Sequence, residues 1–596
     1  MSEIFRYPRR QGAILIGPQH TRFRLWAPSC SAVILEREGH VAVVMDAEDS
    51  GWFRCETFSG DGVRYRYRIS SDVAVPDPAS CAQPEDVHGP SLVVDPASYK
   101  WKNAQWQGRP WEQAVIYEVH VGLCGGYMKL AEDLPRLAEL GITAIELMPL
   151  SEFPGARNWG YDGVFPFAPE SSYGTPDELK YLIDQAHSLG LMIFLDVVYN
   201  HFGPDGNYIP LYAQSFFKKN KQTAWGSSIN FTRQEVCDYF IDNALYWIME
   251  FRFDGLRLDA VQAISERNWL LKLRQIVEET VEDGRFVHLI LENENNDAGL
   301  LRKGFTAQWN DDAHNALHVI LTGEHEGYYG NFSESPLTSL AKVLRDGFCF
   351  QGQMSPVTGK SRGSQSSDLS AEKFIFFLQN HDQAGNRAMG ERLTVLADPD
   401  ALKAAYALML LSPQIPLLFF GEEWGCRTPF FFFTSHTGEL GKIVREGRRN
   451  EFASFSYFHE PERRKLIPDP NEQDTFERSR PDISQVNVAE HAEWLNLTKE
   501  LLKIRHNFII PRLNGARSSG VVILSEKSSG LKMGVAAHWI MSNGARLTIA
   551  VNFGTSFLLF AEISNENLIY ARPASNDSGR LSPRSITVWL QEATNV

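Results

Sequence analysis

The sequence predicts an α/β protein: a (β/α)8 TIM barrel with an N-terminal β-sandwich and a small C-terminal all-β domain. Two observations support this prediction. Through the middle of the chain, eight short runs of almost entirely apolar residues alternate with helical patterns, which is typical of a buried parallel sheet whose strands are joined by helices. Near both ends, polar and apolar residues alternate in short runs separated by Gly- and Asp-rich turns, as in antiparallel sheets.

The chain divides into four predicted segments, because 596 residues are too many for one simple core. They are an immunoglobulin-like β-sandwich at 1–95, a linker at 96–112, the barrel at 113–511 with insertions at 200–231 and 422–484, and the C-terminal β domain at 512–596. The predicted strands of the sandwich are Thr21–Ala27, Ala32–Glu36, Val41–Met45, Trp52–Thr57 and Val63–Ile69.

Predicted strands and helices alternate along the barrel segment. The predicted strands are Ala114–Val121, Ile142–Met148, Leu191–Val198, Gly255–Leu258, Phe286–Leu291, Phe305–Trp309, Lys373–Leu378 and Ile415–Phe420. Helical periodicity predicts helices over Lys129–Leu140, Pro176–Leu189, Gln234–Phe251, Glu266–Asp283, Asp312–Leu321, Ala401–Leu411 and Ala489–Arg505. A doubly wound open sheet is the alternative, but it would usually carry a Gly-rich phosphate turn after its first strand. Gly122–Gly126 reads G-L-C-G-G instead.

After the barrel the pattern is again that of β-strands. The predicted strands of the C-terminal domain are Gly520–Ser525, Gly534–Ile540, Arg546–Asn552, Phe557–Ile563 and Ser585–Leu590.

Charge and cysteine usage limit the function classes. A formal net charge of −15 argues against nucleic acid and anionic membranes as partners, and suits a neutral ligand. The seven cysteines are scattered without a C-x-x-C pair, which is typical of reduced thiols in a cytoplasmic protein. Met1–Gln11 lacks the apolar core of a signal peptide, and no apolar run approaches the roughly 20 residues of a membrane span.

Polar residues gather where four of the barrel strands end. The fourth strand lies in F-D-G-L-R-L-D-A-V, where Arg257 and Asp259 are two residues apart and so point to one face. The others are D-V-V-Y-N-H after strand three, Glu292 after strand five, and Q-N-H-D after strand seven. In a closed barrel these carboxyl ends surround one opening. We therefore expect Asp259, Glu292 and Asp382 to converge there.

Two carboxylates on either side of one bond are what glycoside hydrolysis requires, one as nucleophile and one as acid and base. Arg257 would favour an ionised Asp259, whereas neighbouring carboxylates would keep the acid protonated. Each residue alone is more often a cap, turn or ion-pair residue, and a carboxylate cluster can also bind a divalent metal. Metal binding does not account for an arginine between the acids. Glu294 competes with Glu292 for the acid role, and Glu292 is favoured because it directly follows the strand.

These four motifs resemble the signature regions of the alpha-amylase family of glycoside hydrolases. The resemblance implies that Asp259 is the nucleophile, Glu292 the acid and base, and Asp382 the carboxylate that orients the sugar. It also implies that the sugar at the cleaved bond is bound by Arg257, His201, His381 and Tyr161, the last in G-Y-D-G-V. It implies no metal and no organic cofactor.

Further motifs resemble the trehalose-releasing members of that family. They are F-R-L-W-A-P, H-G-P-S, F-L-Q-N-H-D-Q-A-G-N-R, T-P-F-F-F-F-T-S-H and V-R-E-G-R-R-N-E-F. This resemblance implies a retaining hydrolase that cuts the α-1,4 bond next to the trehalosyl end of a malto-oligosaccharide, as a monomer or homodimer. A glycogen-branching or debranching enzyme is the alternative within the family. A non-catalytic barrel that acts as a transport partner or scaffold is the alternative outside it.

Two aromatic positions near strand eight extend the predicted site. Phe432, within Phe430–Phe433, would stack on the glucose rings of trehalose, although an apolar run after a strand is as often core. Trp424 is expected at the site because it lies just past strand eight. The loop after strand one, H-V-G-L-C-G-G-Y-M, is shorter than in the family and borders the cleft.

Overall fold

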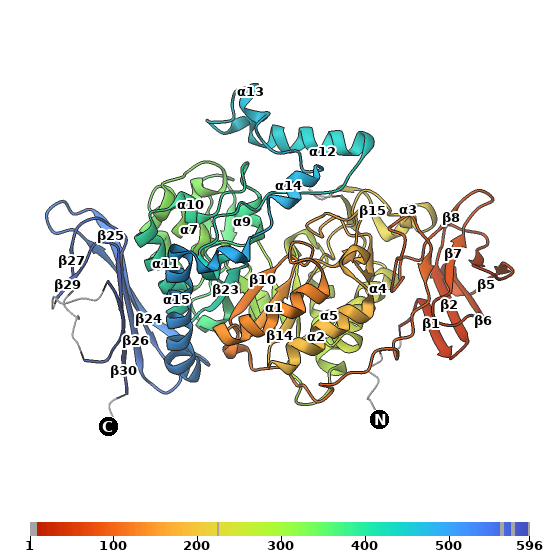
Figure 1. Cartoon of the computed structure of the whole chain (residues 1–596), viewed down its shortest axis with the longest axis horizontal. Helices are drawn as coiled ribbons and strands as arrows, with labels where there is room; N and C mark the ends of the chain where they lie inside the picture. Colours follow the sequence, from red (N-terminus) through yellow and green to blue (C-terminus); the bar gives the residue numbers. More distant parts are fainter. Residues whose placement is uncertain (1–6, 8, 223–225, 561–565, 574–578, 594–596) are drawn as a thin grey trace.

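The computed structural model describes residue 7 and residues 9–222, 226–560, 566–573 and 579–593. A barrel occupies the centre of an elongated molecule, with antiparallel sheets at both ends (Figure 1). The N-terminal sheets lie on one side, the C-terminal sheet lies on the other, and a helical segment projects above the barrel.

Eight parallel strands form the closed barrel, which confirms the predicted fold class. In order around the barrel they are β10 (Ile116–Val119), β11 (Ala144–Leu147), β14 (Met192–Val197), β17 (Gly255–Leu258), β18 (His288–Leu291), β19 (Ala307–Trp309), β22 (Phe374–Phe376) and β23 (Ile415–Phe419). Their residues are buried because helices cover the outside and inward side chains fill the centre. Pairing of β10 with β23 closes the barrel.

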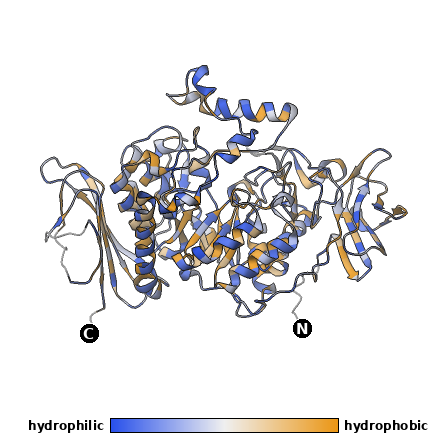
Figure 2. Ribbon diagram, viewed as in Figure 1, coloured by the Kyte–Doolittle hydropathy of each residue, from blue (hydrophilic) through white to orange (hydrophobic). Residues whose placement is uncertain are grey.

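The principal barrel helices are α1 (Tyr127–Leu140), α2 (Pro176–Ser188), α4 (Gln234–Leu245), α5 (Arg267–Thr280), α7 (Asp311–Thr322), α11 (Pro399–Leu411) and α15 (Ala489–Ile504). Hydrophobic and hydrophilic residues are mixed along most of these helices (Figure 2). Helix α11 is mostly apolar and buried, because it also contacts α15 and the C-terminal strands. Local sequence sets their ends. Thr175 and Glu178 form a capping box at the start of α2, and Gly141, at φ 106°, ends α1.

Two departures from the predicted helices have physical reasons. The helix predicted over Gln234–Phe251 ends as an α-helix at Leu245 and continues as one π-helical turn, Tyr246–Glu250. A periodicity of apolar residues does not distinguish these two hydrogen-bonding patterns. The prediction also missed α8 (Pro336–Asp346), which contacts the C-terminal strand β24 and so belongs to the contact between the barrel and the C-terminal sheet.

Two antiparallel sheets pack together before the barrel. One has the order β1 (Gly12–Gly17), β2 (His20–Trp26), β6 (Trp52–Phe58) and β5 (Asp46–Ala47). The other contains β4 (Val43–Val44), β3 (Ile34–Arg37), β7 (Arg64–Arg68) and β8 (Ala74–Val75), with β9 (Ser91–Leu92) also paired to β7. The rings of Phe23 and Tyr65 meet between the sheets, with centroids 4.9 Å apart.

The C-terminal sheet has five strands, in the order β24 (Arg517–Ser525), β25 (Lys532–Ile540), β26 (Arg546–Asn552), β30 (Ser585–Gln591) and β28 (Leu568–Arg572). A two-stranded sheet joins β27 (Leu558–Leu559) to β29 (Arg580–Leu581). The strand predicted over Phe557–Ile563 lies partly outside the described residues, which end at 560 and resume at 566. The prediction missed β28.

Insertions surround the carboxyl ends of the barrel strands. They contain the strands β12 (Ser151–Glu152), β13 (Phe165–Pro169), β15 (Phe217–Gln222), β16 (Ser227–Ile229), β20 (Gln351–Met354) and β21 (Ser361–Gly363). The short helices are α3 (Ile209–Tyr212), α6 (Ala298–Arg302), α9 (His381–Gly385), α10 (Leu393–Leu396), α13 (Pro461–Arg464) and α14 (Gln473–Glu477). With α12 (Gly438–Glu451), α13 and α14 form the projecting segment in Figure 1.

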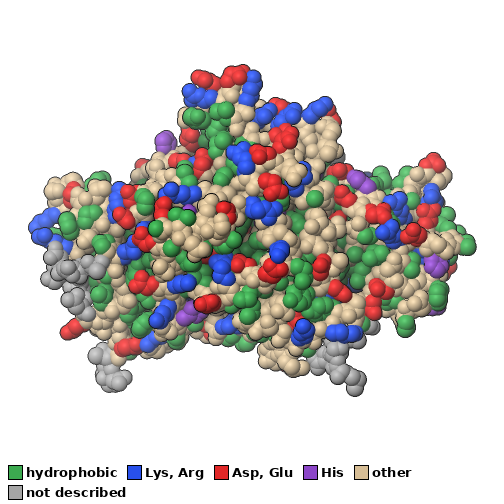
Figure 3. All heavy atoms as spheres, viewed as in Figure 1, with side chains coloured by type: hydrophobic (Ala, Val, Ile, Leu, Met, Phe, Trp, Pro, Cys, Tyr) green, Lys and Arg blue, Asp and Glu red, His purple; other side chains and the backbone are tan. Residues whose placement is uncertain are grey.

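The surface carries charges of both signs. On the face drawn in Figure 3, acidic and basic side chains are interspersed and no large patch of one sign stands out. Within the described ranges, the helices are all too short or too polar to cross a membrane.

Candidate active site

Arg257 is the centre of a charged cluster at the carboxyl ends of the barrel strands. It lies on β17, and its side chain is 1% exposed. Its Nη1 donates to Asp259 Oδ1 at 2.7 Å and to Asp196 Oδ2, at the end of β14, at 2.8 Å. The indole of Trp309 lies 4.2 Å from the guanidinium carbon. Arg257 and Asp259 therefore point to one face of the strand, as their spacing predicted.

Asp259 is held from two sides and remains open on a third. Besides Arg257, Asn200 Nδ2 donates to Asp259 Oδ2 at 2.7 Å. The Asn200 side chain also contacts His201 Nδ1 at 2.5 Å, and His201 Nε2 lies 3.0 Å from the backbone oxygen of Tyr161. The Asp259 side chain is 13% exposed. Asp259 is thus a hydrogen-bonded carboxylate of which a small part stays accessible.

Glu292 directly follows β18 and has a different environment. Its Oε2 accepts a hydrogen bond of 2.6 Å from the backbone N–H of Ala260, which has a left-handed φ of 42°. Burial raises the pKa of Glu292 well above its usual range, nearby Asp259, Asp311 and Asp382 raise it further, and Arg257 opposes them. This environment favours the protonated form of Glu292. Glu294, the competing residue, is exposed.

Asp382 and His381 begin helix α9 after strand β22. The side chain of Asn380 caps this helix by accepting from the backbone N–H of Asp382 at 2.9 Å. His381 is 1% exposed, and its Nε2 lies 2.8 Å from the Tyr161 hydroxyl and 3.4 Å from Asp382 Oδ1. Burial opposes a charged His381, but Asp382 and Glu118 raise its pKa to about 9. The Asp382 side chain is 44% exposed.

Tyr161 links these groups. Its hydroxyl donates to Asp196 Oδ2 at 2.6 Å, and its ring stacks on His381 with centroids 5.2 Å apart. Burial, followed by the charge of Asp259 and opposed by Arg257, raises the pKa of Asp196 to about 6. The structure thus brings together Tyr161, His201, Arg257, Asp259, Glu292, His381 and Asp382.

The two predicted aromatic residues have different environments. Phe432 is half-buried, and its ring meets Trp159 at 5.2 Å, edge to face; Trp159 in turn contacts His381. The other three phenylalanines of the run are buried. Trp424 is 1% exposed, and its ring packs against His491 at 5.0 Å. Trp424 therefore has the environment of a core residue, and the site proposed below excludes it.

Two residues that the sequence reasoning did not assign lie in or under this cluster. Asp311 follows β19, and burial together with Asp382 raises its pKa to about 7. Glu118, inside β10, accepts a hydrogen bond from His381. The signal for Asp311 was present in the acidic pair after strand six, although that pair is also typical of a helix start. Glu118 lies in an apolar run, and no local pattern distinguishes it.

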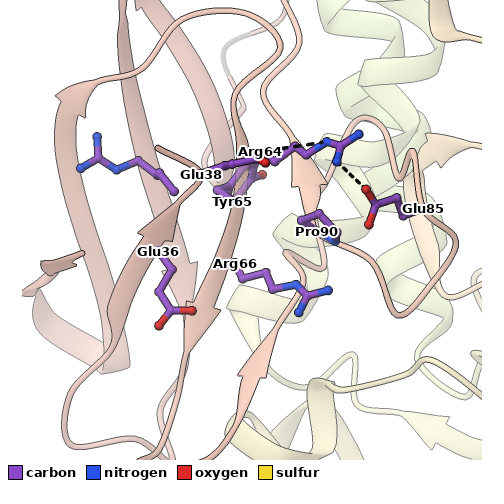
Figure 4. Close-up of a pocket in the computed structure, with 8 residues that line it drawn as sticks. Glu36, Glu38, Arg64, Tyr65, Arg66, Glu85 and Pro90 are labelled. Atoms are coloured by element: carbon purple, nitrogen blue, oxygen red, sulfur yellow. Dashed lines mark hydrogen bonds and ion pairs between the residues drawn. The ribbon is translucent and has the colours of Figure 1, made fainter. Parts of the chain in front are cut away.

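Neither a metal site nor a second chemical centre emerges elsewhere in the described residues. In the ranges that the structure covers, no group of three or more His, Cys, Asp or Glu side chains could hold a metal ion. A groove of about 390 Å³ on the N-terminal sheets is lined by charged side chains (Figure 4). Arg64 in this groove pairs with Glu85 and Glu38, so its charge is already matched.

Comparison with known proteins identifies the family. Residues 96–227 match the model of the alpha amylase catalytic domain. The malto-oligosyltrehalose trehalohydrolase of Deinococcus radiodurans is 40% identical over 497 residues, which cover 82% of each chain. That of a Rhizobium species is 39% identical over 516 residues, covering 82% of this chain and 85% of that protein. The chain belongs to the malto-oligosyltrehalose trehalohydrolase family.

A solved structure agrees with this membership. The crystal structure of a proposed alpha amylase from Salmonella typhimurium superposes with a TM-score of 0.93 at 42% identity, covering 98% of this chain and all of that one. The two chains therefore share one fold over nearly their full length.

Proposed function

We propose that this protein hydrolyses the α-1,4-glucosidic bond next to the terminal trehalose of malto-oligosyltrehalose, releasing trehalose with retention at the anomeric carbon. The substrate is that named for the family to which the chain belongs. The observation that carries the chemistry is the convergence of Asp259 and Glu292 at one end of the barrel, with Arg257 bound to only one of them. Two carboxyl groups in unlike environments are suited to the two roles of a glycosidase.

The first step uses both carboxyl groups at once. An oxygen of Asp259 attacks the anomeric carbon of the glucose on the non-reducing side of the bond, while Glu292 gives its proton to the glycosidic oxygen. The carbon–oxygen bond breaks, trehalose leaves as the alcohol, and a glycosyl ester of Asp259 forms. In the second step Glu292, now ionised, takes a proton from water, and the hydroxyl attacks the same carbon. The malto-oligosaccharide leaves with its α configuration, and Asp259 and Glu292 return to their starting states.

The remaining residues bind the sugar whose bond is cut. Tyr161 supplies an aromatic face beside His381, and His201 lies on the other side of Asp259. Asp382 is exposed enough to accept hydrogen bonds from sugar hydroxyls, which strengthen as the ring flattens. Arg257 keeps Asp259 in place through the 2.7 Å hydrogen bond.

The leaving trehalose is placed near Phe432. The ring of Phe432 is half-buried, so part of it is accessible, and it connects through Trp159 to His381. An aromatic ring at this point would stack on a glucose ring of the trehalosyl end.

A product assay tests the proposed function. The purified full-length protein is incubated with malto-oligosyltrehalose and, separately, with plain maltodextrin, and the products are followed by chromatography and proton NMR. Free trehalose and an α-anomeric malto-oligosaccharide from the first substrate, with much slower action on the second, support the proposal. New α-1,6 branches would show the branching alternative instead, and an inverted β product would refute the roles given to Asp259 and Glu292. Asp259→Asn protein is the inactive control.

A further inference from the structure

Glu118 is a buried carboxylate inside the barrel, on the first strand, and the reaction steps above do not use it. It lies on β10 and is 1% exposed. We propose that Glu118 is a positioning residue: it holds the His381 ring toward the active site and keeps that ring in the doubly protonated, imidazolium form. The inference rests on the proposed function for its consequences in catalysis, but its structural part does not depend on the substrate.

Glu118 forms two hydrogen bonds with His381. Oε1 lies 2.5 Å from His381 Nδ1, and Oε2 accepts a 3.1 Å hydrogen bond from the backbone N–H of His381. One carboxylate therefore fixes both the main chain at the start of α9 and the ring of the same residue. Because β10 belongs to the rigid barrel and His381 to a loop-helix junction, the contact transfers the rigidity of the barrel to the site.

The hydrogen bonds around His381 determine its protons. The Tyr161 hydroxyl has a single hydrogen, which it donates to Asp196 Oδ2 at 2.6 Å. Its oxygen must then accept at the 2.8 Å contact with His381, so Nε2 carries a hydrogen. Nδ1 carries the other hydrogen, which it donates to the Glu118 carboxylate. With both nitrogens as donors, the ring is a cation.

Charged groups on every side of His381 agree with this assignment. Asp382, on its own helix, has Oδ1 3.4 Å from Nε2, and Arg257 on β17 opposes the positive charge. Asp196 on β14 accepts from Tyr161, which stacks on the ring. The other neighbours are His120, with a pKa lowered by burial to about 4, and Glu146 on β11, with a pKa raised well above its usual range by burial and by Glu118. Burial therefore favours the neutral form of both side chains.

Glu146 provides the matched control. It is the Cα partner of Glu118 in the neighbouring parallel strand, and it is also 1% exposed. Neither of its carboxyl oxygens has a hydrogen-bond partner in the described structure. A protonated Glu146 is replaced by Gln without a change in charge, whereas replacing the Glu118 carboxylate by Gln removes the anion from His381.

The direct test is the titration of His381 in the free, full-length protein. Nitrogen-15 NMR of histidine-labelled protein reports the protonation of each ring, and the His381 signals are assigned by their loss in His381→Gln. In the wild type, where the pKa is about 9, we expect about nine-tenths of His381 to be imidazolium at pH 8. In Glu118→Gln we expect the pKa of His381 to fall by at least about one unit, so that about half or less of His381 is imidazolium at pH 8. Glu146→Gln should titrate like the wild type.

An unchanged His381 titration in folded Glu118→Gln would overturn the inference, as would an equal shift in Glu146→Gln. If Glu118→Gln fails to fold, Glu118→Asp, which keeps the negative charge, is measured in its place. In Glu118→Asp protein, His381 should stay charged at pH 8. The consequence for catalysis is read from binding of malto-oligosyltrehalose in a Glu292→Gln background, where position 292 no longer titrates. For each protein the ratio of Kd at pH 8.5 to Kd at pH 6.5 is measured. We expect this ratio to be at least about twofold larger in the Glu118→Gln, Glu292→Gln double variant than in Glu292→Gln alone. Failure of the wild type to release trehalose would refute the proposed function and leave the NMR result standing.

Discussion

Replacing Arg257 by Met tests how the buried charges at the site depend on one guanidinium. The side chains of Arg257 and Asp196 are each 1% exposed and joined at 2.8 Å. Removing the cation leaves Asp196 buried with only the Tyr161 hydroxyl as a described partner. Breaking a buried pair in this way typically costs about 3–5 kcal/mol of folding free energy, because the remaining charge is uncompensated. We expect a loss at the lower end of that range, about 3 kcal/mol, in Arg257→Met at pH 8.

The loss should depend on pH with a definite sign. In the wild type the folded-state pKa of Asp196 is already raised to about 6, above an unfolded value of about 3.9. Without Arg257 the folded pKa rises further. A carboxyl whose pKa is raised on folding loses stability as pH rises between the unfolded and folded values. Below about pH 6, Asp196 is protonated in both proteins, so the difference between them should be small there and grow by up to about 1.4 kcal/mol per pH unit above it.

Urea unfolding followed by tryptophan fluorescence at pH 5, 6.5 and 8 measures this difference. The control is the same substitution in an Asp196→Asn background, where position 196 cannot ionise and the pH dependence that it causes should disappear. A deficit of the same size at all three pH values, or one below about 1 kcal/mol at pH 8, would refute the reasoning, because it would mean that Arg257 contributes packing rather than charge.

Three further predictions concern the reaction. Asp259→Asn should lower turnover of malto-oligosyltrehalose, measured by single-turnover kinetics, by at least about 10⁴-fold. Its thermal stability should change little. Turnover within tenfold of the wild type would show that another group attacks. For Glu292, which must be protonated, kcat/KM should fall as pH rises through its raised pKa, and this alkaline decrease should be absent from the residual activity of Glu292→Gln. Phe432→Ala should raise KM for malto-oligosyltrehalose about 10-fold with a small change in stability. Trp424→Ala should instead cost about 3–5 kcal/mol of folding free energy and leave KM of the folded enzyme unchanged. The opposite pattern would place Trp424 at the substrate and Phe432 in the core.

The barrel and most of the cluster were predictable because the relevant signals are local. A buried parallel strand is an apolar run, and in a barrel its carboxyl end faces the common opening, so a polar residue directly after the run is placed without knowledge of its partners. Arg257 and Asp259 follow from the two-residue period of a strand alone. The ends of the strands were less well predicted. Phe286 lies outside β18, and Lys373 lies outside β22 in a preceding turn.

What the sequence did not reveal depends on contacts between distant residues. Trp424 lies just past the eighth strand, as expected, but the chain turns so that its ring packs on His491 of α15, 67 positions later. Position relative to a strand end does not determine which side of a loop faces the opening. Glu118 is separated from His381 by 263 positions, and inside the run Ile116–Val119 it reads as one polar residue in a buried strand.

The environments of the two central carboxyl groups also support the proposed assignment of their roles. Asp259 accepts hydrogen bonds from a guanidinium and an amide, both of which stabilise a carboxylate. Glu292 accepts only a backbone N–H among its described hydrogen bonds, and faces three other carboxyl groups. The cations at the site, Arg257 and His381, are both bound to residues other than Glu292, namely Asp196, Asp259 and Glu118. Glu292 therefore has no hydrogen-bonded cation to stabilise its ionised form, which favours the protonated form that the proposed mechanism requires. Removing Glu118 would free His381 from its present partner.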